Sequence, residues 1–237
     1  MKRLNLLVLL GLSAYLCSGQ TTPAGQAAPL VDPTLDNKGL PFYVKLIPEP
    51  APDPFRKITA KQRFDLYAEL TFSPFAGIFG ALGGAIDQGT NSPAEWGQGW
   101  GAFGKRTASS YGAAFVGNTI TYGLSAAFRD DNRYFRSHKD GFKGRLGSVL
   151  ISPYVAHNNS GGTRFSSSSF LGGAGQAGIP LLWSPPSWQG WNNVMINYAV
   201  WYGYSAGINF FREFYPSVVA YYKRKQASHA AAKTPAP

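Results

Sequence analysis

Cysteine and histidine are scarce in this chain of 237 residues, which has one cysteine and three histidines. One cysteine excludes a scaffold held by disulfides and any site built from several thiolates, such as an iron–sulfur cluster or a structural zinc site. The histidines, His138, His157 and His229, include no pair at the spacing of metal ligands. We therefore expect no metal and no other cofactor.

Charged residues are also few, at 14% of the chain, and the formal net charge is +10. No charged residue occurs in Leu70–Ile86, in Thr107–Phe128 or between Arg164 and Arg212. Helices that face water seldom stay uncharged for so long, so this pattern predicts association with a membrane. The same stretches are rich in glycine, serine and asparagine, and the mean hydropathy is −0.15. None of them therefore predicts a helix that spans a bilayer.

The first residues have the three-part pattern of a secretory signal peptide. A basic start at Lys2 and Arg3 is followed by the mostly apolar segment 4–16 and by small residues up to Gly19. Cleavage after Gly19 would remove the only cysteine, and we expect an exported protein of the periplasm or the outer membrane. Two alternatives stay open: an uncleaved anchor helix, for which the apolar segment is short, and a lipid on Cys17, which the large preceding leucine disfavours.

The rest of the chain divides into three parts. Residues 20–56 hold nearly half of the 17 prolines, and because proline fixes φ and lacks an N–H donor, we expect an extended leader there. Residues 57–222 form the predicted ordered body. Residues 223–237 begin with a run of cations and continue with alanine, serine and proline, which predicts a basic disordered tail.

Three helix starts are marked within the body. Thr59 and Gln62 fit a capping box, in which the two side chains satisfy free N–H groups of the first turn. Ser92 and Glu95 fit a second box, with a proline at the first helical position. Ser73, also followed by a proline, marks the third start.

Small residues recur at every fourth position in several segments. Positions four apart lie on one face of a helix, and a face of small residues lets a second helix approach closely, as between membrane helices. Glycine inside a helix costs about 1 kcal/mol relative to alanine, so such glycines require close packing in return. The glycines that we assign to helix packing are Gly80, Gly84, Gly117, Gly203 and Gly207.

The fold class that follows is mainly α: a glycine-rich bundle of closely packed helices, associated with a membrane. A water-soluble bundle with close helix crossings fits the small residues nearly as well. A small outer-membrane β-barrel with a channel or adhesive role is the other alternative, since residues 194–210 are apolar at even positions and mostly small or polar at odd ones. A barrel needs at least about eight such strands, and only one weaker candidate, at 120–128, accompanies this one, so helices are favoured.

Two short motifs match catalytic or cofactor-binding patterns but lack their context. Residues 173–178 read G-x-G-x-x-G, without the preceding strand or the later acidic residue that a dinucleotide site needs. Residues 203–207 read G-x-S-x-G, followed only by Glu213 and His229 as partners for a catalytic triad. Glycine-rich helix packing explains both segments better, so an enzyme is the less favoured interpretation.

Four acidic residues lie near predicted helix ends, where paired acids could serve as acid and base in catalysis. We assign Asp87, Glu95, Asp130 and Asp131 to helix caps and helix dipoles instead. An envelope hydrolase or lipid-modifying enzyme that uses Asp87, Glu95 or His138 is the third class of function considered.

The densest group of charges lies in residues 129–145. The mixed signs favour a structured loop with internal ion pairs. The alternative is contact with phosphate-bearing partners such as anionic lipid headgroups. Nucleic acid would suit the charge equally well, but export disfavours it. The cations that would make the headgroup contact are Arg129, Arg133, Arg136, Lys139, Lys143 and Arg145.

Several segments resemble an uncharacterised family of exported bacterial envelope proteins. They are Ala85–Gln88 with Trp96–Gly99, Asp131–Arg136, and Asn209–Pro216. The chain departs from the family at Asn132, where other members have proline. The resemblance implies an envelope protein and brings no activity with it.

The function expected from the sequence is therefore a structural or interaction role at a membrane of the cell envelope. The expected partners are membrane lipids or other envelope proteins, and the small-residue faces could also drive self-association.

Overall fold

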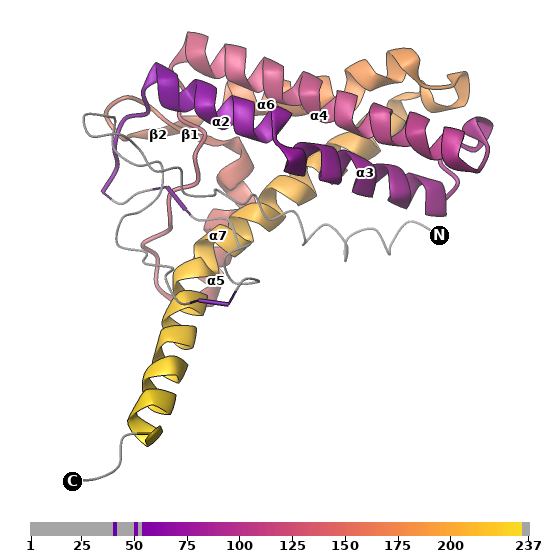
Figure 1. Ribbon diagram of the computed structural model, residues 1–237. Coiled ribbons are helices and arrows are strands. Elements are labelled where there is room, and N and C mark those ends of the chain that lie inside the picture. The colour runs from indigo at the N-terminus through magenta and orange to yellow at the C-terminus, as the bar shows by residue number, and fades with distance from the viewer. Residues whose placement is uncertain (1–39, 42–49, 52–53, 234–237) are drawn as a thin grey trace.

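The computed structural model describes residues 40–41, 50–51 and 54–233 (Figure 1). The predicted signal peptide, most of the predicted leader and residues 234–237 lie outside these residues. The described elements are the helices α2 (Ala60–Phe72), α3 (Pro74–Gly89), α4 (Trp100–Phe128), α5 (Gly141–Ile151), α6 (Ser167–Gly178) and α7 (Trp191–Lys233), the strands β1 (Val155–His157) and β2 (Thr163–Phe165), and the short 3-10 helices η3 (Ala94–Trp96), η4 (Ser152–Tyr154), η5 (Ile179–Trp183) and η6 (Pro186–Trp188).

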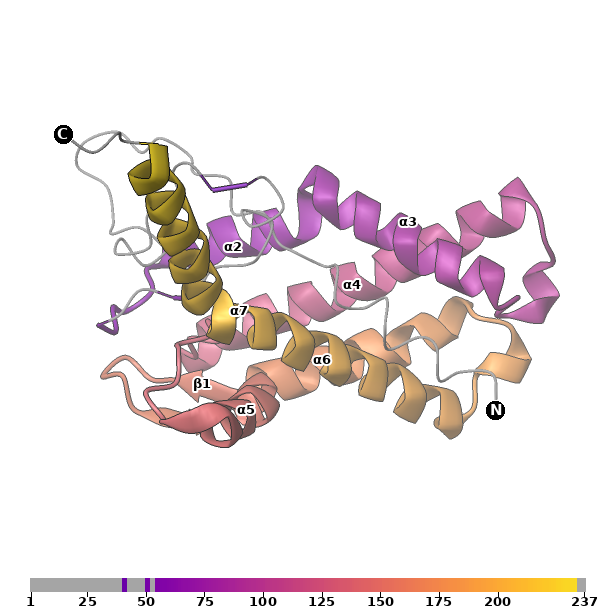
Figure 2. The same ribbon diagram turned by 90° about the horizontal axis from the view of Figure 1, so that it is seen from below.

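The protein is mainly helical, which confirms the predicted fold class at that level. α3, α4, α6 and the first half of α7 lie side by side in that order, and α2 continues the line of α3 (Figure 2). The antiparallel hairpin β1–β2 and α5 lie at one end of this layer, which we call the hairpin end. The connections 90–99 and 179–190 form the opposite end, which we call the turn end. The second half of α7 projects away from the body (Figure 1).

Two of the three predicted helix starts are confirmed. The Thr59 hydroxyl accepts a hydrogen bond from the Gln62 N–H at 3.2 Å, and the Gln62 side chain accepts one from the Thr59 N–H at 3.0 Å. These two bonds complete the capping box at the start of α2. At the start of α3, the Ser73 hydroxyl accepts from the Ala76 N–H at 3.3 Å.

The third predicted start is wrong. Ser92 and Glu95 lead only into the short helix η3, which has no side-chain cap. Gly97 and Gly99 follow with φ values of +69° and +98°, a region that glycine adopts at little cost. They turn the chain, so that α4 begins only at Trp100.

α7 differs from expectation at both of its ends. Residues 194–210, whose alternation suggested a strand, are helical. Alternate positions of a helix do not share a face, so the strand interpretation of this segment is wrong. The helix also continues to Lys233, through most of the segment 223–237 for which the sequence predicted disorder.

Three of the glycines assigned to helix packing lie where a second helix comes close. A Cβ atom added to Gly80 of α3 would lie 2.9 Å from a side-chain carbon of α4, and one added to Gly84 would lie 2.7 Å from the Thr107 backbone nitrogen. A Cβ atom added to Gly117 of α4 would lie 2.7 Å from the Cβ atom of Gln176 in α6. Only glycine allows these separations, because non-bonded atoms do not approach so closely.

The packing glycines expected in α7 are replaced by glycines of α6. A Cβ atom added to Gly207 would meet no atom of the described residues within 4 Å, so the structure gives Gly207 no packing role. Gly203 is half-buried, and its role stays a prediction. In α6, by contrast, a Cβ atom added to Gly173 would lie 2.7 Å from the indole ring of Trp201 in α7. The glycine-rich segment of α6 therefore brings that helix close to α7.

We expect Gly84→Ala to lower the free energy of unfolding by about 1–3 kcal/mol, because the new methyl group would meet the backbone of Thr107. Gly77→Ala in the same helix is the matched control, since nothing lies within 4 Å of a Cβ atom there. The control should gain up to about 1 kcal/mol from helix propensity. Chemical denaturation in mild detergent, followed by circular dichroism, measures both changes. Equal changes in the two variants would contradict the close packing of α3 on α4.

Candidate functional site

The interior of the described chain contains several charged side chains. Arg106 and Glu213 each have an exposed fraction of 0%, and Asp130 has 2%. Such groups are seldom buried unless they are paired and hydrogen-bonded. Three groups of polar contacts hold them, which we call the Asp130 cluster, the Glu213 cluster and the Arg106 cluster.

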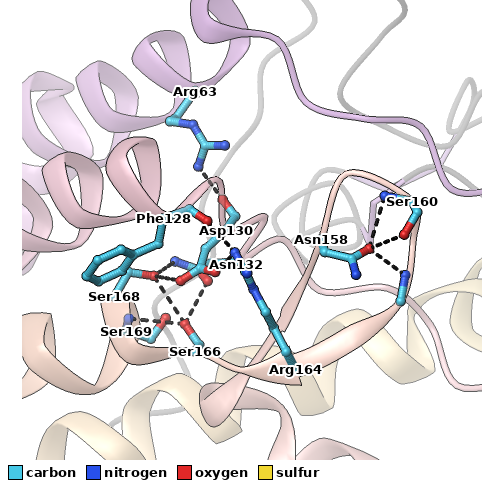
Figure 3. A network of polar contacts seen from close by, with 11 residues as sticks. Arg63, Phe128, Asp130, Asn132, Asn158, Ser160, Arg164, Ser166, Ser168 and Ser169 are labelled. Atoms are coloured by element: carbon cyan, nitrogen blue, oxygen red, sulfur yellow. Dashed lines mark hydrogen bonds and ion pairs between the residues drawn. The ribbon is translucent and has the colours of Figure 1, made fainter.

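Asp130 follows α4 directly, and its contacts join several elements (Figure 3). One carboxylate oxygen pairs with Arg164 of β2 at 2.5 Å, and the other accepts a hydrogen bond from the Ser168 hydroxyl of α6 at 2.8 Å. Arg63 of α2 donates to the Asp130 carbonyl, and Arg164 also donates to the carbonyl of Phe128. The Asp130 cluster therefore fixes α2, the end of α4, the hairpin and α6 relative to one another.

Asn132 and Ser166 complete the Asp130 cluster. The Ser166 hydroxyl donates to Asn132 Oδ1 at 2.8 Å, and Asn132 Nδ2 donates to Ser168 Oγ at 2.9 Å. Ser166 also caps α6, since its oxygen accepts from the Ser169 N–H at 3.1 Å. The Ser168 hydroxyl donates to a carboxylate rather than to an imidazole, so this arrangement is not that of an activated serine nucleophile.

The neighbouring Asp131 has a different set of partners. Its two carboxylate oxygens accept hydrogen bonds from Arg133 Nε at 2.9 Å and Nη2 at 2.7 Å in a bidentate pair, and the Arg133 N–H also donates to it at 3.1 Å. Its backbone pairs in both directions with that of His157 at 2.9 Å. The His157 ring lies against Phe55 and Phe135, and its burial lowers the pKa of the imidazole. The imidazole is therefore neutral at pH 7 and packs as an aromatic ring.

The Glu213 cluster connects α7 to α5 and to the segment before α5. Arg145 Nε donates to Glu213 Oε1 at 2.7 Å, and the guanidinium lies 4.3 Å from the Phe214 ring centre. The Tyr134 hydroxyl and the Ser137 N–H donate to Glu213 Oε2 at 2.8 and 2.9 Å. Burial and the hydrogen bond to Glu213 raise the pKa of Tyr134, so the phenol stays a donor.

The Arg106 cluster holds the α3–α4 connection at the turn end. The guanidinium donates to the carbonyls of Ser92 at 2.9 Å, Gly97 at 2.9 Å and Pro93 at 2.7 Å. Its remaining contacts are with the side-chain oxygens of Gln88 and Asn91. One side chain of α4 therefore binds the backbone of segment 90–99 at three points.

The six cations predicted to contact lipid headgroups separate into two groups. Arg133 pairs with Asp131 within the segment 129–145, as the mixed signs favoured, whereas Arg145 pairs with Glu213 of α7. The other four are exposed and form no ion pair within the described part of the chain: Arg129, Arg136, Lys139 and Lys143.

The residues considered for a hydrolase do not come together. Asp87 in α3 and Glu95 in η3 belong to the turn end, whereas His138 precedes α5 near the hairpin end (Figures 1 and 2). Asp130 and Asp131, expected to cap helices, have buried carboxylates that pair with Arg164 and Arg133 instead. Among the residues that the structure describes, no group of three or more histidine, cysteine, aspartate or glutamate side chains could hold a metal ion.

An open groove of about 510 Å³ lies at the hairpin end between α5, the hairpin and α7. Its lining is mostly apolar, and its one charged side chain, Arg164, already pairs with Asp130. The lining includes no acid–base pair that could support catalysis. The groove is formed by Leu150, Ile151, Tyr154, Val155, Phe165 and Tyr202, with Thr163 and Arg164.

Large apolar side chains are exposed along the uncharged helices. Ile78 of α3 has an exposed fraction of 56% and Met195 of α7 one of 63%. A soluble monomer seldom exposes extensive apolar surface. The helix α2 carries more charge, including Asp65 and Glu69. Further exposed apolar side chains are Phe72 at the end of α2, Phe115 of α4, Phe170 and Leu171 of α6, and Ile196 of α7.

Within the described part of the chain, no helix taken singly combines the length and the apolar character needed to cross a membrane. The bent pair formed by α2 and α3 does meet both criteria by length and composition. No protein-family model, curated protein or solved structure matches the chain.

Sequence reasoning missed the Arg106 and Glu213 clusters. Their members are separated by up to 79 residues, and no local pattern connects them. Gln88 and Gly97 contact Arg106, Asn132 belongs to the Asp130 cluster, and Glu213 centres its own.

Proposed function

We propose that this chain is an exported cell-envelope protein with a structural or interaction role at a lipid membrane. The observation that carries the proposal is the distribution of side chains: Arg106, Asp130 and Glu213 lie in the interior, while large apolar groups are exposed along the uncharged stretches of the helices. In water, each Å² of this exposed apolar surface costs roughly 25 cal/mol of free energy relative to burial. Against lipid the same surface is favourable.

The polar side chains of α4 support this proposal, because they face other helices. The Tyr111 hydroxyl donates to the Thr71 carbonyl at 2.7 Å, and Asn118 Nδ2 donates to the Leu70 carbonyl at 3.2 Å. Tyr67 of α2 and Thr119 share a hydrogen bond at 3.0 Å. Polar groups that lower the hydropathy of one helix are therefore satisfied between helices, as in bundles embedded in lipid.

The exposed cations near the hairpin end suit the surface of such a membrane. Arg129, Arg136, Lys139 and Lys143 are free to contact phosphate groups, at about 1 kcal/mol for each cation close to an anionic surface. The signal-peptide pattern at residues 1–19 supports export to the envelope.

We expect the purified chain to float with phosphatidylcholine vesicles in a density gradient. Ile78→Glu, which places a charge on the apolar face of α3, should reduce vesicle partition at least about tenfold. Asn159→Glu, which places the same charge at an exposed position in the hairpin turn, is the matched control and should leave partition unchanged. A wild-type chain that stays at the bottom of the gradient would overturn the proposal.

A further inference from the structure

We propose that the turn end lies at a lipid–water interface and that the uncharged helices run from it into the hydrocarbon layer. The inference rests on the proposed membrane association, and it adds the orientation of the bundle relative to the lipid surface. Its partner is a lipid surface.

Tryptophan is concentrated at the turn end, although the residues involved are far apart in the sequence. Ser187 of η6 donates a hydrogen bond to Glu95 of η3, and Trp183 Nε1 donates to Ser109 Oγ of α4 at 3.0 Å. These contacts join the two connections, which lie at the same end of the layer in both views (Figures 1 and 2). Five of the six tryptophans belong to this end: Trp96, Trp100, Trp183, Trp188 and Trp191.

The outermost of these side chains are the most exposed large apolar groups of the described chain. Trp100 has an exposed fraction of 88%, Leu182 one of 82% and Trp191 one of 78%. An indole combines a large apolar ring with one N–H donor, and tryptophan is therefore enriched where membrane proteins cross the lipid–water interface. In water, these exposed side chains have no environment as favourable as the lipid–water interface.

The charges at the turn end are compatible with a zwitterionic headgroup layer. Its charged residues are the half-buried Asp87, the exposed Glu95 and Lys105, and Arg106, which is fully buried and hydrogen-bonded, so there are two of each sign. The Ser187 hydroxyl stabilises the Glu95 carboxylate and lowers its pKa, so this group stays ionised and belongs in the headgroup layer. This end can reach lipid without burying an unpaired charge.

The length of the uncharged helix surface supports the same placement. On α4, the exposed cations Lys105 and Arg129 lie on either side of the uncharged segment Thr107–Phe128. At about 1.5 Å per residue this segment is roughly 33 Å long, so the uncharged surface of α4 extends well beyond the turn end.

The test uses the intrinsic indoles and lipids brominated at defined depths, which quench fluorescence on contact. In the wild-type chain, lipids brominated near the headgroup should quench the turn-end indoles. Trp201 lies ten residues along α7 from Trp191, about 15 Å deeper, and lipids brominated near the chain ends should quench it. Trp100→Phe/Trp191→Phe should reduce the shallow quenching, because it removes the two most exposed of the five turn-end indoles. Trp201→Phe, the matched control, should remove the deep quenching.

The outcomes separate this inference from the proposed function. Flotation with vesicles but no shallow quenching of the turn-end indoles would overturn the inference and leave membrane association intact. No flotation at all would overturn the proposed function. A wild-type dimer that becomes a monomer in Trp100→Ser/Trp191→Ser, with indoles shielded from bromine, would assign the turn end to a second copy of the chain and also overturn the inference.

Discussion

Replacing Glu213 with alanine is expected to lower the free energy of unfolding by roughly 3–5 kcal/mol. The carboxylate is fully buried and accepts hydrogen bonds from Arg145, Tyr134 and Ser137. Without it, the Arg145 guanidinium keeps its charge while its side chain is only 23% exposed. The Tyr134 hydroxyl and the Ser137 N–H lose their acceptor at the same time. The loss is large because removing one partner leaves a charge and two donors unpaired.

Denaturation midpoints in mild detergent measure this loss of stability. Two further variants, with smaller expected losses, serve as comparisons. Tyr134→Phe removes one hydrogen bond of the cluster and should cost about 1 kcal/mol, so it remains informative if Glu213→Ala does not fold. Asp65→Ala breaks the exposed ion pair with Lys61 and should cost less than about 1 kcal/mol. A Glu213→Ala midpoint equal to that of Asp65→Ala would show that the cluster does not hold α5 against α7.

Arg106→Ala is expected to destabilise the protein by about 3 kcal/mol and to open the α3–α4 connection. The carbonyls of Ser92, Pro93 and Gly97 each lose the donor that now satisfies them, and an unsatisfied buried acceptor costs about 1–3 kcal/mol. Arg106→Lys should recover only part of the loss, because an ammonium group cannot reproduce the planar array of guanidinium donors.

Limited proteolysis at residues 90–99, together with the thermal midpoint, reports on this connection. The neighbouring Lys105→Ala is the matched control, since Lys105 is exposed and its loss should leave both measurements unchanged. Cleavage of Arg106→Ala at the wild-type rate, with an unchanged midpoint, would mean that the connection does not depend on the buried guanidinium.

The helical layer could be predicted from the sequence because its signals are local. The capping box at Thr59 and the serine–proline start at Ser73 involve neighbouring residues only, and both are confirmed. The glycines at positions 80 and 84 share a face of α3 and contact α4 as expected. A helix start at Ser92 failed because the nearby glycines turn the chain, and a four-residue pattern does not include them.

The polar interior could not be predicted because its partners are distant in the sequence. Arg106 looked like one more cation, yet it is the centre of a cluster whose other members precede it by up to 18 residues. Arg133 and Arg145 looked equivalent to Lys139 and Lys143, but only the two arginines have buried carboxylates beside them. Which cations stay exposed depends on tertiary contacts that spacing alone does not specify.

The position of Glu213 within α7 bears on the order in which the protein is completed. This carboxylate follows Arg145 by 68 residues and Tyr134 by 79 residues. Because the chain emerges with its N-terminus first, α5 appears well before the carboxylate that pairs with Arg145. During that interval α5 and the segment before it have no final docking partner. The hairpin end therefore reaches its final packing last, after α7 has emerged.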